Sequence, residues 1–164
     1  MTQSKKVVPI LSVILILLTV GLVWGCSQSE TSIATQTKFE TIEQKYYSAI
    51  DEPFQKVIKD KSSWHDFWNK LQANHSESSP PPTVNFTEKM VIGVGLGTRN
   101  TGGYDIQIKE ISFKEDKISV DYVERQPGTN CIVTESLTQP YQLVSIDKSD
   151  LPVEFNSKTE IVSC

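Results

Sequence analysis

The residue whose chemistry the sequence specifies most clearly is Cys26. It lies shortly after an uncharged, mainly apolar stretch, Val7 to Val23, which two lysines precede. A basic start, an apolar stretch and a small residue, here Gly25, directly before a cysteine are typical of a bacterial lipoprotein signal. We therefore expect residues 1–25 to be a signal peptide and Cys26 to be the lipidated N-terminus of the mature protein.

Two other interpretations of this segment stay open. The apolar stretch is close to the roughly 17 to 20 residues that span a membrane, so it can also be a retained anchor. Trp24 is bulky for a lipoprotein cleavage site, which leaves simple secretion as a third possibility. All three place the body of the protein outside the cytoplasm. For the lipoprotein, Ser27 in place of an aspartate favours the outer membrane if the host has two membranes.

If Cys26 is lipidated, two cysteines remain, Cys131 and Cys164. In an oxidising compartment they can form a disulfide, and the alternative is a free thiol at Cys164. Neither cysteine has a CxxC partner or a histidine-rich neighbourhood, so we expect no metal site. His65 and His75 lack acidic or cysteine companions at useful spacing, and we assign both to the surface.

No pattern of catalytic residues stands out, and we expect neither a cofactor nor an enzyme. Gly93, Gly95 and Gly97 follow a predicted strand, but no helix follows them to hold a phosphate. Glycines in a strand instead allow close approach of other groups, here the aromatic side chains of the predicted helix. Glu115 and Asp116 lie between two lysines and are typical of a solvated hairpin turn.

Size and charge restrict the function further. Without residues 1–25, the chain keeps 139 of its 164 residues, enough for one domain with a real core. Removing the two lysines of the signal leaves 14 basic against 20 acidic residues, a net charge of about −6. This balance argues against a nucleic-acid partner, whose phosphates require a basic face.

The elements that position any site begin after a tether. Residues 26–37 are mostly polar and predict a flexible tether, so we expect the domain to occupy residues 38–164 and residues 39–58 to be extended. From Ser63 to Ala73 a helix is predicted, since four apolar side chains share one face, and Ser63 with Asp66 resembles a capping box. The four are Trp64, Phe67, Trp68 and Leu71. We expect both tryptophans to pack in the core.

Downstream of Val84 the apolar period becomes two, which predicts strands. An apolar stretch covers Met90 to Leu96, and alternating segments follow around Ile106, Val120 and Leu143, with a short last strand at Val153 and Phe155. No helical pattern separates them, so we expect hairpin connections. The predicted fold class is α+β, mainly β: a small antiparallel sheet or barrel-like domain with one short amphipathic helix packed on it.

Three loops carry many turn residues: Gly97 to Tyr104, Gln126 to Asn130 and Leu137 to Tyr141. Glycine and proline preset backbone angles, so such loops are rigid before they meet a partner. They either serve the fold alone or present a binding surface. For a surface, Arg and Tyr are the residue types that dominate interface energetics, which singles out Arg99, Tyr104 and Tyr141.

The same residues resemble the protease complex subunit PrcB family, through its C-terminal domain. The resemblance rests on Val91 to Arg99, Thr101-Gly-Gly-Tyr104, Pro127-Gly128, Cys131 to Thr134, Leu137-Thr-Gln-Pro-Tyr141 and Leu151 to Phe155. Asn100 departs from the family, where proline is common. The candidate binding residues are Arg99, Thr101, Gly102, Gly103, Tyr104, Pro127, Gly128, Gln139, Pro140 and Tyr141.

The resemblance implies a small, non-catalytic, exported lipoprotein. The family is named after a member that associates with a secreted subtilisin-like protease and helps to mature or stabilise it. A polypeptide partner, with the membrane reached through lipid, is therefore our first hypothesis. One alternative is a protease inhibitor, since the loops are loosely similar to those of chagasin-type inhibitors. Another is an envelope protein that binds glycan, with Trp64 or tyrosines stacking on sugar.

Overall fold

The computed structural model describes residues 35–74 and 79–164, which lie in one compact unit, Ser32–Cys164. The predicted signal peptide, Cys26, most of the predicted tether and His75 lie outside the described residues. Thr35 and Gln36 already pair with a strand of the domain, slightly before the predicted start at residue 38.

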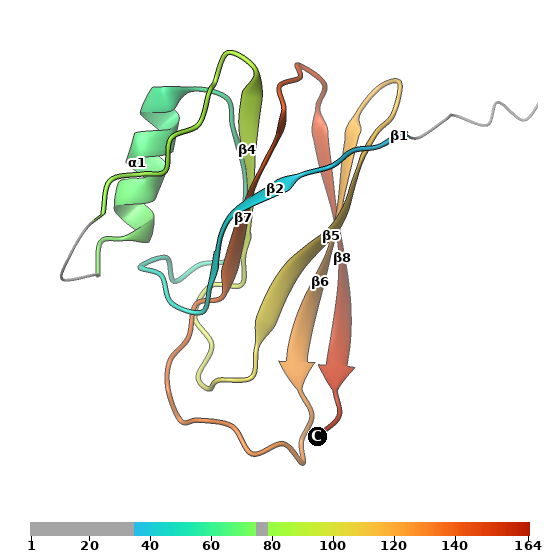
Figure 1. Ribbon diagram of the computed structural model, residues 1–164. Helices are drawn as coiled ribbons and strands as arrows, with labels where there is room; N and C mark the ends of the chain where they lie inside the picture. Colours follow the sequence, from blue (N-terminus) through green and yellow to red (C-terminus); the bar gives the residue numbers. More distant parts are fainter. Residues whose placement is uncertain (1–34, 75–78) are drawn as a thin grey trace, which may run out of the picture. The chain divides into compact units, whose positions relative to one another are not determined.

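The described chain folds into two four-stranded sheets and one helix (Figure 1). The first sheet has the strand order β1-β5-β6-β8 and the second has the order β2-β7-β4-β3. In chain order the elements are β1 (Thr35–Gln36), β2 (Glu40–Lys45), β3 (Phe54–Ile58), α1 (Lys61–Leu71), β4 (Lys89–Gly95), β5 (Asp105–Phe113), β6 (Ile118–Pro127), β7 (Tyr141–Asp147) and β8 (Val153–Val162). The expected fold class, mainly β with one short helix, is confirmed, and the described strands form two separate sheets instead of one closed barrel.

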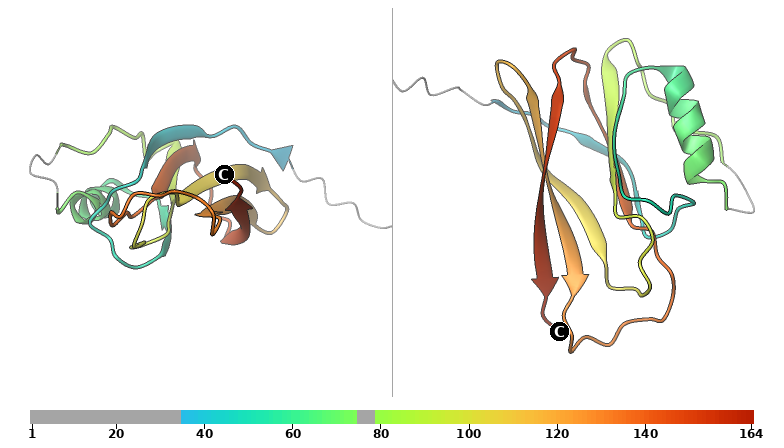
Figure 2. Two further views of the ribbon diagram at one scale, coloured as in Figure 1. Left: turned by 90° about the horizontal axis from the view of Figure 1, so that it is seen from below. Right: turned by 180° about the vertical axis from the view of Figure 1, so that it is seen from behind.

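The domain has three layers, with the second sheet between the first sheet and α1 (Figure 2). Met90, Ile92 and Val94 of β4 face the first sheet, and Val91 faces α1. A strand that is covered on both faces loses its polar alternation. This double burial explains the near-continuous apolar stretch from Met90 to Leu96.

Helix α1 covers the second sheet with the predicted apolar stripe. Trp64 and Trp68 are almost fully buried, as expected, and their indole N–H groups donate to the carbonyls of Pro82 and Ser79 at 3.0 and 2.8 Å. The helix begins earlier than predicted. Its N-cap is Asp60, whose carboxylate accepts the backbone N–H of Ser63 at 2.9 Å, so the predicted cap residue is instead the donor.

Strand β8 differs most from the prediction. It is longer than the expected segment at Val153 and Phe155, and it pairs in parallel with β6. The two strands are parallel because the chain leaves the first sheet after β6, forms β7 in the second sheet and then returns. The other strand pairs are antiparallel, as expected.

The glycines of β4 permit a close approach, but not by an aromatic side chain of the helix. A Cβ atom on Gly95 would lie 2.2 Å from the ring of Phe54, which belongs to the neighbouring strand β3. Phe54 in turn meets Phe67 of α1 edge to face, with 5.3 Å between the ring centres. The glycine thus makes room for a strand residue that links the sheet to the helix.

Candidate functional site

Three loops meet at one end of the domain: residues 46–53, 96–104 and 128–140 (Figure 1). Arg99 and Thr138 exchange backbone hydrogen bonds of 2.8 and 3.0 Å. The backbone N–H of Gln139 donates to the carbonyl of Tyr46 at 2.8 Å, and that of Thr98 donates to the carbonyl of Asp51 at 2.8 Å. Each loop is therefore hydrogen-bonded to another, which holds the surface in one arrangement.

A hollow of about 310 Å³ lies among these loops, and we call it the tyrosine hollow. Its lining consists of Tyr46, Tyr47, Gly102, Gly103, Tyr104, Asp105, Thr134 and Thr138. Tyr46 and Tyr47 expose 53% and 54% of their surface, a large fraction for aromatic side chains. Tyr104 is half-buried, with the guanidinium of Arg99 5.7 Å from its ring centre. The hollow thus offers three aromatic rings on a fixed frame.

The two glycines of the Thr101–Tyr104 segment are required by the packing of the loops. A Cβ atom on Gly102 would lie 2.4 Å from the hydroxyl of Thr134. Gly103 has φ = +84°, a backbone conformation that side chains other than glycine rarely adopt. The pair allows the 96–104 loop to lie directly against the 128–140 loop and places Tyr104 at the hollow.

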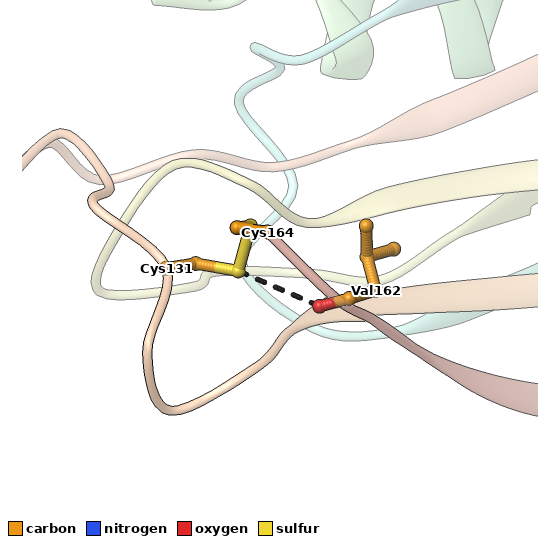
Figure 3. The surroundings of a disulfide bond; sticks show 3 residues. All are labelled: Cys131, Val162 and Cys164. Carbon is orange, nitrogen blue, oxygen red and sulfur yellow. Dashed lines mark hydrogen bonds between the residues drawn. A yellow bond between two sulfur atoms is a disulfide. The ribbon is translucent and has the colours of Figure 1, made fainter.

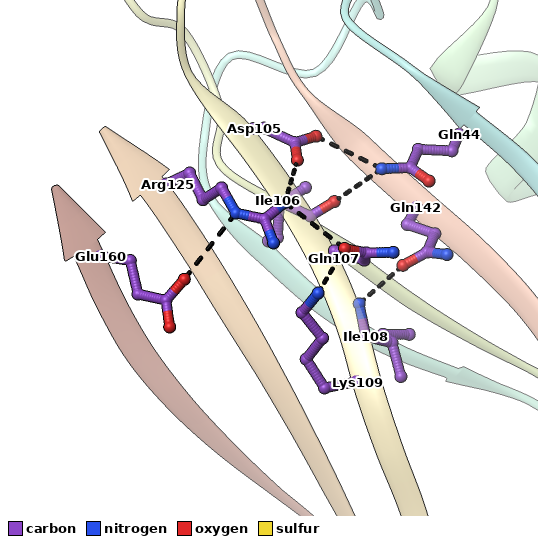
Figure 4. Close-up of polar contacts among 9 residues, drawn as sticks. All are labelled: Gln44, Asp105, Ile106, Gln107, Ile108, Lys109, Arg125, Gln142 and Glu160. Carbon is purple, nitrogen blue, oxygen red and sulfur yellow. Dashed lines mark hydrogen bonds and ion pairs between the residues drawn. The ribbon is translucent and has the colours of Figure 1, made fainter. Parts of the chain in front are cut away.

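A polar network links the strands that adjoin Tyr46 and Tyr104 (Figure 4). Gln44, near the end of β2, donates to the carboxylate of Asp105 at 3.3 Å and to the carbonyl of Ile106 at 3.2 Å. Arg125 donates to the other oxygen of Asp105 at 2.9 Å, and its Nε lies 3.8 Å from the carboxylate of Glu160. Because Tyr46 follows β2 and Tyr104 precedes β5, the network fixes one tyrosine relative to the other.

A second contact joins the two sheets, between β5 and β7. The ladder between β5 and β6 shifts register between Ile108 and Glu110. There the backbone N–H of Ile108 donates to the side-chain oxygen of Gln142, a buried residue of β7, at 2.6 Å (Figure 4). The glutamine satisfies a buried donor and anchors the start of β5 to the opposite sheet.

The 128–140 loop is also covalently fixed. Cys131 and Cys164 form a disulfide that joins this loop to the chain just after β8 (Figure 3). Cys131 Sγ lies 3.4 Å from the carbonyl oxygen of Val162, and since a disulfide sulfur carries no proton this is a contact and not a hydrogen bond. The backbone N–H of Gly128 adds a hydrogen bond of 2.9 Å to the same carbonyl.

The structure brings many of the sequence-predicted residues together at this end. Thr101, Gly102, Gly103 and Tyr104 line the hollow or adjoin it, and the guanidinium of Arg99 lies over the ring of Tyr104. The remaining members do not line the hollow. Gln139 supports Tyr46, Pro127 lies beside Gly103, and Gly128 lies near the disulfide.

Pro140 and Tyr141 are buried, which argues against Tyr141 as an exposed anchor. The Tyr141 ring packs under α1 with Trp64 and Leu143, and its hydroxyl donates to the carboxylate of Glu43. Burial, and then the neighbouring Glu43, raise the pKa of Tyr141 far above its ordinary value. The side chain points into the core because Tyr141 is the first residue of β7 and not part of a free loop.

Sequence reasoning missed five residues of the hollow: Tyr46, Tyr47, Asp105, Thr134 and Thr138. The signal was present at the two tyrosines, since adjacent tyrosines cannot both point to the buried face of a strand. Asp105, Thr134 and Thr138 carried no comparable signal, because only the meeting of distant loops makes them neighbours.

A larger groove of about 540 Å³ lies between β3 and α1, with Phe54, Val57 and Phe67 in its lining. None of the candidate binding residues belongs to it. We place the candidate site at the tyrosine hollow, despite its smaller volume, because exposed aromatic rings and interlocked loops coincide there.

The described residues show no metal-binding group of three or more His, Cys, Asp or Glu side chains. His65 is exposed on α1. Among residues 35–74 and 79–164, no helix is long and apolar enough to cross a membrane.

Comparison with known proteins places the central segment of the chain in a family. Residues 90–147, from β4 to the end of β7, match the family model described as PrcB C-terminal, so this segment belongs to that family and the resemblance is confirmed. The match includes two of the three loops around the hollow, and the family points to a role connected with a protease complex. Neither the curated proteins nor the solved structures contain a match.

Proposed function

We propose that this protein is a non-catalytic accessory module, exported and anchored by lipid at Cys26, that holds a polypeptide partner against the tyrosine hollow. The partner that best fits the family is a secreted subtilisin-like protease, which the module steadies during maturation or afterwards. Supporting the proposal, the family match covers the 96–104 and 128–140 loops, which form most of the hollow.

The observation that carries the proposal is the set of exposed tyrosines on interlocked loops. Tyrosine supplies a large contact area and a polar tip while losing little conformational entropy on binding. The backbone around it is already paired, so little further ordering is needed when a partner arrives. Such a surface is suited to binding.

The chemistry of the lining also favours binding over turnover. Covalent catalysis needs a nucleophile within reach of a base. Of the two threonines in the lining, Thr138 already donates its hydroxyl to the carbonyl of Thr101 at 3.0 Å, and the hollow is lined by neither histidine nor cysteine among the described residues. The carboxylate of Asp105 is occupied by Arg125 and Gln44.

Site-directed photo-crosslinking in the native host tests this proposal. A benzophenone amino acid replaces Tyr46 or Tyr104 in the full chain, and Ile161, which is 73% exposed on β8, gives the matched control. We expect both tyrosine positions, but not position 161, to crosslink to a secreted protease. Equal crosslinking at all three positions, or none to a polypeptide, would contradict the proposal.

The recovered protease then separates stabilisation from inhibition. Added in excess, the purified domain should slow the thermal inactivation of the protease and leave its initial rate of substrate cleavage unchanged. A stoichiometric fall in the initial rate would establish an inhibitor instead.

A further inference from the structure

We infer that the partner segment that enters the tyrosine hollow is a proline-containing stretch in the polyproline II conformation. The inference rests on the proposed function, because it names the chemistry of the segment that the hollow receives. It is drawn from three features of the hollow: its rings, its hydroxyl groups and the state of its backbone.

The rings match the shape of such a ligand. Polyproline II segments present flat pyrrolidine rings at regular intervals, and the sites that bind them are grooves lined by aromatic side chains. Tyr46 and Tyr47 lie on one loop and Tyr104 on another, so the hollow has aromatic groups from two directions. Each ring offers an apolar surface against which a proline can pack.

The hydroxyl groups of these tyrosines are available to a ligand. Elsewhere in the domain, Tyr122 accepts a hydrogen bond of 2.8 Å from Gln55, and Tyr141 donates to Glu43. The hydroxyls of Tyr46, Tyr47 and Tyr104 have no such partner among the described residues. A polyproline II segment has no internal hydrogen bonds, so its carbonyl groups are free to accept from these hydroxyls.

The backbone at the hollow argues against a ligand that adds as a β-strand. The carbonyl of Tyr46 already accepts from Gln139, and the N–H of Gly102 already donates to Thr134 at 2.9 Å. Strand addition needs unpaired backbone groups along an edge. Side-chain recognition of an extended segment without strand pairing is therefore the better fit.

The charged groups also argue against a sugar ligand. Recognition of sugar hydroxyls needs charged or amide side chains that are free to form several hydrogen bonds. At the hollow, Asp105 is held by Arg125 and Gln44, and Arg99 lies over the ring of Tyr104. The rings of Tyr46 and Tyr47 remain accessible, while the charged groups are already engaged.

Calorimetric titration of the purified domain tests the inference with three probes. The first is a capped peptide of Pro-Pro-Ala repeats, about ten residues long. The second has alanine at every proline position, and the third is an oligomer of N-acetylglucosamine. We expect the first probe to bind and the other two to bind at least about tenfold more weakly. Equal binding of the two peptides, preference for the sugar or no binding of the proline peptide would each overturn the inference.

Variants locate the binding. Tyr46→Ala with Tyr47→Ala should weaken the proline peptide at least about tenfold, and Tyr46→Phe with Tyr47→Phe only a few-fold, because the rings remain. Ile161→Ala, at an exposed site on β8, should change nothing. Circular dichroism confirms that each variant is folded. A loss that is equal for Ile161→Ala would contradict binding at the hollow.

The polyproline inference and the proposed function can fail independently of each other. If the tyrosine positions crosslink to a protease but the proline peptide does not bind, the polyproline inference fails and the accessory role stands. If the proline peptide binds but no polypeptide crosslinks in the host, the proposed role fails.

Discussion

At the scale of single residues, Tyr141 is one of the side chains that fill the interface between β7 and α1. Tyr141 is fully buried there, so replacing it tests the core and not the hollow. We expect Tyr141→Ala to lower the free energy of unfolding by about 3–5 kcal/mol, as for other buried aromatic residues. Tyr141→Phe should cost less, about 1.5–3 kcal/mol, the contribution of one hydrogen bond to a charged group. Urea denaturation measures both, and an unchanged midpoint for the alanine variant would contradict the burial.

Gly95 of β4 has no room for a larger side chain, because the ring of Phe54 lies against it. A methyl group there would overlap the Phe54 ring, so we expect Gly95→Ala to destabilise the domain by about 1–3 kcal/mol. If the overlap is the cause, adding Phe54→Leu to Gly95→Ala should recover part of the loss. Denaturation of the two single variants and the double variant gives the coupling, and strict additivity would show that the overlap is not responsible.

At the scale of elements, the start of α1 depends on a charged carboxylate. The backbone N–H of Ser63 donates to Asp60, and this hydrogen bond lowers the pKa of Asp60 below its ordinary value of 3.8. A lowered pKa in the folded state means that the stabilisation is present above the ordinary value and is lost as the pH falls through the folded one. We therefore expect the melting temperature of the wild type to exceed that of Asp60→Asn at neutral pH. The difference should shrink below about pH 4, and a constant difference from pH 7 to pH 2 would contradict this origin.

The disulfide links two elements that the sequence keeps apart, separated by 33 residues. In the chain-entropy model, closing a loop of this length stabilises the folded state by about 3.5–4 kcal/mol. The variant with both Cys131→Ser and Cys164→Ser should be less stable by about that amount, and reducing the wild type should have a similar effect. Thermal melts with and without dithiothreitol measure it. If reduction destabilises the double variant as well, the effect does not come from this bond.

The elements also show where sequence reasoning works. The stripe from Trp64 to Leu71 predicts both the helix and its buried face, because helical spacing and burial agree there. Strand β8 was underestimated because residues 156–159 are polar and exposed, so hydrogen bonding to β6 holds them in a strand without an apolar pattern. The parallel pairing depends on where the chain goes between β6 and β8, which local periodicity does not encode.

The candidate site could be predicted only in part, because local sequence patterns do not show which distant segments meet. Turn residues predict rigid loops, and the Gly102-Gly103 pair does bring Tyr104 to a shared surface. Whether a tyrosine in such a segment is exposed depends on the strand beside it: Tyr141 begins the buried strand β7, whereas Tyr46 follows the mostly exposed strand β2. Pro140 is typical of a loop, so the sequence did not indicate that a buried strand begins at the next residue.

At the scale of the whole molecule, the proposed role requires attachment to a membrane through Cys26. We expect Cys26→Ala to abolish incorporation of an alkyne-labelled fatty acid and to leave the protein at the size of the uncleaved precursor. Metabolic labelling followed by gel analysis measures both, with Cys131→Ser and Cys164→Ser as the control that retains the label. Labelling that persists in Cys26→Ala would contradict the anchor.

The disulfide has a mechanical consequence when the protein is pulled by its two chain ends. Force transmitted through the chain can peel apart strands outside the covalent loop, but the 33-residue interval that holds β7 and β8 cannot be drawn out. That interval corresponds to about 110 Å of extended chain. Stretched in an optical trap between its two chain ends, the oxidised protein should lengthen by about that much less than the reduced one.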